Sequence, residues 1–181
     1  PARARPLLLG HNHPRTTEAM EQALNADRPV HTLDITTPVK EQFVDSLFKS
    51  LPDEFAERAK IQFCSPAGTD AVEAALKLVK TATGNRSILG FHGAYHGMTN
   101  GALALMGDTN PKEPLSGLMN DVHHLPYPYD YRCPFGVGGE TGRRIASEYV
   151  QNLPAYDKTG VTDPSGLIAA PVPGPCSAPR A

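Results

Sequence analysis

The chain has 181 residues, and its 17 Lys and Arg residues against 19 Asp and Glu residues leave a net charge of -2. This length allows one ordinary domain with a sizeable core, and the absence of a long basic run argues against a nucleic-acid partner. No apolar run is long enough to span a membrane, and the first residues lack the order of a secretory signal. Three widely spaced cysteines without a CxxC pair favour a reducing, cytoplasmic location; they are Cys64, Cys133 and Cys176.

The first 60 residues predict two helices. Pro14 suits the first turn of a helix, because proline lacks an amide that would be unpaired there, and apolar residues follow at helical spacing as far as Leu24. A second helix is expected to begin at Thr37 and Pro38, a side-chain cap followed by a proline at the first helical position. Apolar residues recur at helical spacing behind it until Pro52 ends the run.

Beyond residue 60 the pattern changes to alternating strands and helices. Residues 61–65, with Cys64 expected in the core, form a short apolar run that ends in a Pro-Ala-Gly turn, which is typical of a buried strand. The helix that follows pairs Glu73 with Lys77 one turn apart, and residues 87–91 again predict a strand. Strand, turn, helix and strand in this order predict an α/β fold with a mostly parallel sheet and flanking helices. The apolar face of the helix comprises Val72, Ala75, Leu76 and Val79.

The second half of the chain is less regular. Residues 109–139 are rich in Pro and Gly and are expected to form a long loop, of a kind that is usually functional. Ile145, Tyr149 and Leu153 then mark another helix. The segment 171–181 is dominated by Pro, Ala and Gly and is expected to be unstructured.

A candidate anion site lies at the turn before the helix, in the run Pro-Ala-Gly-Thr-Asp-Ala at residues 66–71. Gly68 lets the backbone come close to a ligand, and the first helical turn presents unpaired amides that suit a phosphate. The Thr69 hydroxyl adds a further donor. The same residues also fit a plain helix cap by Thr69 or Asp70, with Glu73 at capping-box spacing. The turn alone leaves both interpretations open.

The loop at residues 92–97 favours the phosphate interpretation. Tyr95 and His96 follow a predicted strand at its carboxyl end, where open α/β sheets bind ligands. An aromatic side chain there can stack on a flat ring, and His96 can hydrogen-bond to it. The sequence has a candidate phosphate-binding turn and an aromatic side chain next to it. It lacks both a Walker lysine and an acidic residue placed to bind a ribose. This combination favours pyridoxal phosphate over a nucleotide.

Histidine pairs elsewhere do not predict a metal centre. His11 with His13, and His123 with His124, lack carboxylates or cysteines at ligand spacing, so we expect no metal.

Together these segments resemble the class III aminotransferases. The resemblance is carried by FCSPAGTDAVEAALK at residues 63–77, GNR at 84–86, FHGAYHG at 91–97 and GHNHP at 10–14, in the family's order and spacing. It covers residues 7–168, and the segment 127–136 is most similar to the diaminobutyrate–2-oxoglutarate branch.

The resemblance implies the large domain of a fold-type I, pyridoxal-phosphate-dependent transferase, present here only in part. It implies that Gly68 and Thr69 bind the cofactor phosphate, that Tyr95 stacks on the pyridine ring and that His96 lies beside the cofactor. It further implies an amino acid and a 2-oxo acid as substrates, and a homodimer whose subunits share the active site. The expected organisation is an N-terminal helical segment at 1–60, a partial cofactor-binding domain at 61–168 and an aberrant tail at 169–181.

The lysine that holds the cofactor in this family has no counterpart here. Lys77, Lys80 and Lys112 show no pattern of burial and are expected at the surface, so no catalytic residue is named. Ala170 stands where the family has a glutamate, and prolines follow it, which predicts a decayed or truncated end. We therefore expect this chain to be inactive alone. The alternatives are a non-catalytic module that binds a phosphate ligand or a protein, and a chain that does not fold stably.

Overall fold

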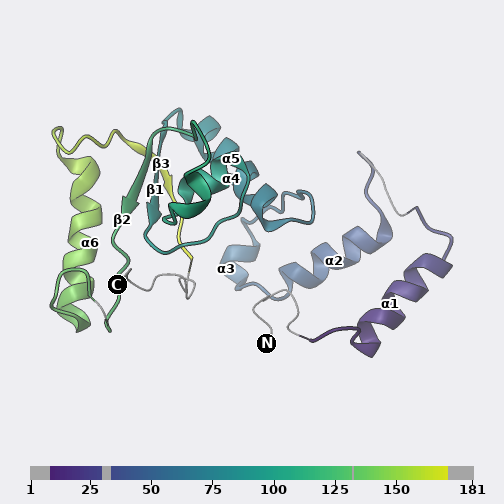
Figure 1. The fold of residues 1–181 in the computed structure, drawn as a ribbon. Helices are drawn as coiled ribbons and strands as arrows, with labels where there is room; N and C mark the ends of the chain where they lie inside the picture. Colours follow the sequence, from purple (N-terminus) through teal and green to yellow (C-terminus); the bar gives the residue numbers. More distant parts are fainter. Residues whose placement is uncertain (1–8, 30–33, 132, 171–181) are drawn as a thin grey trace. The chain divides into compact units, whose positions relative to one another are not determined.

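The computed structural model of the protein describes residues 9–29, 34–131 and 133–170 (Figure 1). The chain divides into two compact units, Pro1–Gln62 and Phe63–Ala181. Within the described ranges, no helix is both long and apolar enough to cross a membrane.

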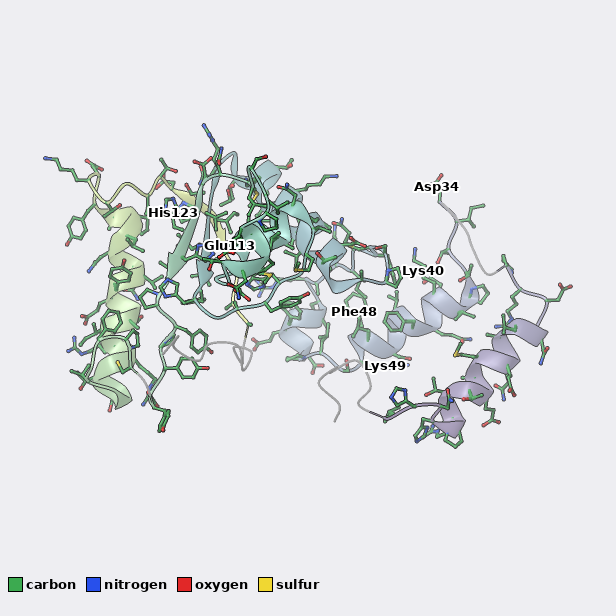
Figure 2. All side chains as sticks on the ribbon, viewed as in Figure 1. Asp34, Lys40, Phe48, Lys49, Glu113 and His123 are labelled. Atoms are coloured by element: carbon green, nitrogen blue, oxygen red, sulfur yellow. The ribbon has the colours of Figure 1, made fainter. Side chains whose placement is uncertain are left out.

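Among its described residues, the first unit contains three helices: α1 at Pro14–Asn25, α2 at Pro38–Phe48 and the short α3 at Asp53–Ala56. Both predicted helices are therefore confirmed. At the start of α2, the N–H of Lys40 (Figure 2) donates to the Thr37 hydroxyl at 3.2 Å, which is the expected side-chain cap. The apolar face of α1 is exposed in this chain, and no residue of α1 or α2 is buried.

The second unit is built on a sheet of three parallel strands. These are β1 at Ser87–Phe91, β2 at Val122–Leu125 and β3 at Pro164–Leu167, in the order β2-β1-β3. The central strand β1 is almost entirely buried, because it has a neighbour on each edge. The predicted α/β fold with a parallel sheet, and the predicted strand at 87–91, are confirmed.

Helices α4 (Gly68–Thr83) and α5 (Asn100–Leu105) cover this sheet, and Figure 1 shows them beside the strands. Helix α4 packs on α5 and β3, while α5 packs on β1 and β2. Leu76, Ile88 and Leu105 form the centre of the core, one each from α4, β1 and α5. Val72 and Val79 pack against that centre, which confirms the predicted apolar face except at Ala75, which is exposed. The remaining elements are the 3-10 turn η1 at Asn110–Lys112 and helix α6 at Gly139–Ala155, which confirms the helix predicted there.

Three expectations about these segments are wrong. Residues 61–65 form no strand, and Cys64 is exposed and not in the core. A strand needs a neighbour for its backbone hydrogen bonds, and residues 61–65 pair with none of the three strands of the described sheet. Residues 109–139 are also not a continuous loop, because they contain η1 and β2. The predicted unstructured segment 171–181 lies outside the described residues.

Candidate functional site

The first turn of α4 presents the backbone of Gly68 and Thr69. The residue before the helix, Ala67, is extended, and no side chain caps this end of the helix. The alternative interpretation of this turn, a helix cap by Thr69 or Asp70, is therefore not what the structure shows. A side chain built at Gly68 would meet no atom within 4 Å, so the space in front of this turn is open. Unpaired amides facing open space at the positive end of a helix suit a phosphate group.

The loop that ends at Gly97 packs directly on Thr69. The hydroxyl of Thr69 lies 2.7 Å from that of Thr99, which immediately precedes α5. A Cβ atom at Gly97 would lie 2.5 Å from the Cβ of Thr69 and would collide with it, and Gly97 has a φ of +128°. The turn at residues 66–71 and the loop at 92–97, which are separate in sequence, thus lie side by side.

Glu73 joins the same contact one helical turn further along α4. One of its carboxylate oxygens, Oε1, accepts the Thr99 hydroxyl at 2.6 Å and the backbone N–H groups of Gly101 and Ala102 at 2.8 and 3.1 Å. Burial by itself raises the pKa of Glu73, but the hydrogen bonds from Thr99, Ala102 and Gly101 outweigh it, and the pKa lies below its usual value. The expected ion pair with Lys77 is wrong, since the carboxylate of Glu73 is directed at α5.

Tyr95 and His96 differ in their surroundings. Tyr95 is 63 % exposed, so it is accessible to a ligand on which its ring can stack. His96 is half-buried, and within the described part of the chain its Nε2 atom is buried without a hydrogen-bond partner. Burial lowers the pKa of His96, and the neighbouring His124 lowers it further. A neutral imidazole nitrogen that lacks a partner fits a ligand that supplies a donor or acceptor.

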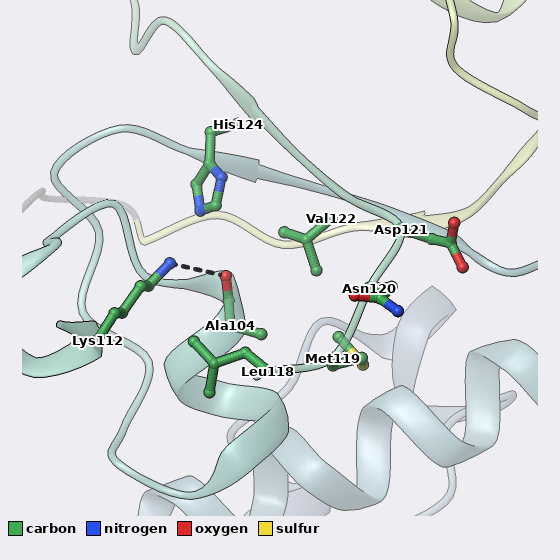
Figure 3. A pocket seen from close by; sticks show the side chains of 8 residues that line it. All are labelled: Ala104, Lys112, Leu118, Met119, Asn120, Asp121, Val122 and His124. Carbon is green, nitrogen blue, oxygen red and sulfur yellow. Dashed lines mark hydrogen bonds between the residues drawn. The ribbon is translucent and has the colours of Figure 1, made fainter. Parts of the chain in front are cut away.

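Lys112 differs from the surface position expected for it. Its Nζ atom donates to the carbonyl of Ala104 at 3.1 Å, drawn in Figure 3, and to that of Met106 at 2.5 Å. Burial lowers the pKa of Lys112, although the nearby Asp108 carboxylate raises it. The ammonium group thus binds the open carbonyls at the C-terminal end of α5, which is a structural role. Lys77 is exposed as expected, whereas Lys80 is partly buried.

A cavity of about 340 Å³ lies beside Lys112. His124 reaches toward it from β2 (Figure 3). Its Nε2 atom lies 3.2 Å from the Leu105 carbonyl. Burial, followed by the charge of Lys112, lowers the pKa of His124. None of Gly68, Thr69, Tyr95 and His96 lines this cavity. The other lining residues are Ala104, Leu118, Met119, Asn120, Asp121 and Val122.

Sequence reasoning missed Glu73 and Thr99 as members of the site. The spacing of Thr69 and Glu73, one helical turn apart, matches that of Gly97 and Gly101 on the facing segment. A polar pair and a glycine pair with the same spacing were the available signal in the sequence. The sequence alone does not show that the two pairs contact each other, because that contact depends on how the two segments fold together.

Comparison with known proteins agrees with this architecture. Residues 3–176 match the family model described as aminotransferase class-III. The chain is 50 % identical over 168 residues to a diaminobutyrate–2-oxoglutarate aminotransferase of Rhizobium meliloti (strain 1021), covering 93 % of this chain and 36 % of that relative. A protein of the same name from Haemophilus influenzae is 44 % identical over the same shares of both chains. The chain thus spans about a third of the length of these relatives.

Solved structures show the same fold. An omega-transaminase from Thermomicrobium roseum superposes with a TM-score of 0.72 at 23 % identity, over 91 % of this chain and 37 % of that one. An omega-aminotransferase from Paracoccus denitrificans gives a TM-score of 0.73 at 19 % identity, over 93 % and 38 %. A taurine:2-oxoglutarate aminotransferase from Bifidobacterium kashiwanohense, solved in complex with PLP and glutamate, gives 0.73 at 21 % identity, over 88 % and 35 %. The described sheet and helices are therefore part of a fold-type I transferase domain.

Proposed function

Since this chain belongs to the class III aminotransferases, we propose that it supplies part of the pyridoxal-phosphate site of such an enzyme. In this proposal Gly68 and Thr69 hold the cofactor phosphate through the first turn of α4. Tyr95 stacks on the pyridine ring, and His96 contacts the cofactor from the same loop. When bound, the cofactor supplies an electron-withdrawing ring that activates the amino group of a substrate.

One observation carries this proposal above the others: the contact of Thr69 with Gly97 and Thr99. It puts an uncapped helix start next to the loop that carries an exposed aromatic ring and a histidine nitrogen without a partner. An anion site beside an aromatic face fits a phosphorylated heteroaromatic ring. The cavity beside Lys112 lacks any of these residues and is a weaker candidate for the cofactor.

The substrates and the assembly are proposed from the relatives. Two of them, 50 and 44 % identical, are named diaminobutyrate–2-oxoglutarate aminotransferases, which supports transfer of an amino group from a diamino acid such as 2,4-diaminobutyrate to 2-oxoglutarate. A homodimer is proposed for the complete enzyme, in the cytoplasm, with no nucleic-acid or membrane partner. The segments 1–60, 61–168 and 169–181 remain our proposed organisation.

The lysine that holds the cofactor covalently is proposed to come from sequence outside these 181 residues. Lys112 is the strongest candidate within the chain, because burial lowers its pKa, yet its ammonium group is engaged by two carbonyls of α5. We therefore propose that the chain binds the cofactor reversibly and is inactive alone.

Titration of the purified chain with pyridoxal phosphate, followed by absorbance and then by borohydride reduction, tests the proposal. We expect saturable binding that inorganic phosphate weakens, and no lysine adduct after reduction. A specific adduct on Lys112 would contradict the external lysine. Absence of binding to the folded chain would contradict the cofactor site and favour a non-catalytic module.

A further inference from the structure

In the contact between α4 and the segment before α5, the donor and the acceptor of each hydrogen bond can be identified. Glu73 Oε1 receives three hydrogen bonds, two of them from main-chain N–H groups. An oxygen with three donors directed at it is an ionised carboxylate oxygen with no hydrogen to give. The hydroxyl of Thr99 must therefore donate to Glu73.

The donation from Thr99 to Glu73 determines whether Thr69 donates or accepts in its own contact with Thr99. A threonine hydroxyl has one hydrogen, and that of Thr99 is already given to Glu73. In the 2.7 Å contact between the two hydroxyls, Thr69 is then the donor and Thr99 the acceptor. The hydrogen of the Thr69 hydroxyl is consequently turned toward α5 and away from the open space in front of Gly68.

Two glycines allow this approach. At Gly101 a Cβ atom would lie 2.5 Å from Glu73 Oε2 and 2.8 Å from Leu76 Cδ1, and at Gly97 it would collide with Thr69. The α4 residues Thr69 and Glu73 therefore fit against backbone that carries no side chain. We call the group formed by Thr69, Glu73, Gly97, Thr99 and Gly101 the α4–α5 seam.

We propose that Glu73 is a positioning residue of the cofactor site: through Thr99 it holds the Thr69 hydroxyl, so that α4 binds phosphate by its main-chain amides and not by that hydroxyl. The inference rests on the proposed pyridoxal-phosphate site and assigns its phosphate contacts. The seam also fixes the loop of Tyr95 and His96 relative to the helix start, because Gly97 ends that loop.

The test measures the dissociation constant of pyridoxal phosphate for the 181-residue chain and its variants. Thr69→Val and Thr99→Val should each weaken binding about 3- to 10-fold, because each interrupts the hydrogen bonds that run from Thr69 through Thr99 to Glu73. The double variant should be no weaker than the worse single one, because both changes break the same chain of hydrogen bonds. Thr99→Ser should restore wild-type affinity, and Glu73→Gln should be milder than Glu73→Ala, since it keeps an accepting oxygen.

Thr83→Val is the matched control. Thr83 lies at the other end of α4, where its hydroxyl donates to the Val79 carbonyl at 2.7 Å, so this variant should bind like the wild type. If Thr69→Val loses binding more than about 100-fold while Thr99→Val binds normally, the hydroxyl holds the phosphate directly and the inference is overturned.

Amide hydrogen exchange in the absence of ligand separates this inference from the proposed function. Glu73→Ala should remove protection of the Gly101 and Ala102 amides, whereas Thr83→Val should retain it. A wild-type chain that binds no pyridoxal phosphate but shows this exchange pattern would refute the cofactor site and leave the seam intact. Unchanged exchange in Glu73→Ala would refute the seam itself.

Discussion

Gly97 and Thr69 approach so closely that no side chain fits between them: a Cβ atom at Gly97 would lie 2.5 Å from the Cβ of Thr69 and 3.1 Å from its Cα. The two residues belong to different segments, one ending the loop after β1 and the other beginning α4. Their contact brings together the two halves of the proposed cofactor site.

Gly97→Ala should therefore destabilise the second unit by about 3 kcal/mol, combining backbone strain at a φ of +128° with overlap against Thr69. It should also weaken pyridoxal phosphate binding. Urea denaturation and cofactor titration measure the two effects. Gly160→Ala is the control, because Gly160 has a φ of +76° but open space around it, so only the strain of about 1 kcal/mol applies. Equal losses in both variants would contradict the close contact.

Gly68→Asp should lower the affinity for pyridoxal phosphate at least about 10-fold without loss of fold. The new carboxylate would stand in the open space at the start of α4 and repel a phosphate. It would meanwhile stabilise the helix by about 0.3 to 1 kcal/mol through the helix dipole. Gly117→Asp introduces the same charge at an exposed loop position with open space and should bind normally. Normal binding by Gly68→Asp would place the phosphate elsewhere.

Leu105→Ala should cost about 2 to 5 kcal/mol of the free energy of unfolding, because Leu105 is 0 % exposed at the centre of the core. Leu78→Ala in α4 removes the same atoms from a side chain that is 58 % exposed, and should change stability by less than about 0.5 kcal/mol. Thermal or urea unfolding followed by circular dichroism compares the two. Similar effects would show that α5 is not packed on the sheet.

Stability should fall as the pH is lowered below about 6.5. The pKa values of His96 and His124 lie below 6.5 in the folded chain, through burial first and then through neighbouring positive charge. The unfolded chain therefore takes up protons before the folded chain does, so the stability present above 6.5 is lost on acidification.

Each of these histidines contributes at most about 1.4 kcal/mol per pH unit. Below about 4.5, protonation of Glu73, whose pKa is also lowered, should add a further loss. Urea midpoints measured from about pH 7.5 to 4 follow both steps. The double variant His96→Gln, His124→Gln should flatten the first step and keep the second, and an unchanged first step in that variant would contradict the assignment.

Local pattern alone predicted much of the fold and proposed the residues of the candidate site. Prolines, a threonine cap and helical spacing located α1 and α2, and a short apolar run located β1. These features depend on neighbours within a few residues, so the sequence displays them directly. The family also follows from local motifs, because the turn at 66–71 and the loop at 92–97 occur together in the right order.

The tertiary structure decided which side-chain and backbone groups interact with each other. Glu73 looked like half of a surface ion pair with Lys77, but its oxygen binds Thr99, 26 residues away along the chain. Lys112 looked solvated, but it binds the end of α5. Residues 61–65 had strand composition, but they pair with none of the strands β1, β2 and β3. In each case a polar group or backbone edge takes the partner that folding brings near it, and that partner is distant in sequence. The sequence thus pointed to the two segments of the proposed site, whereas their contact through Thr69 and Gly97 arises only in the folded chain.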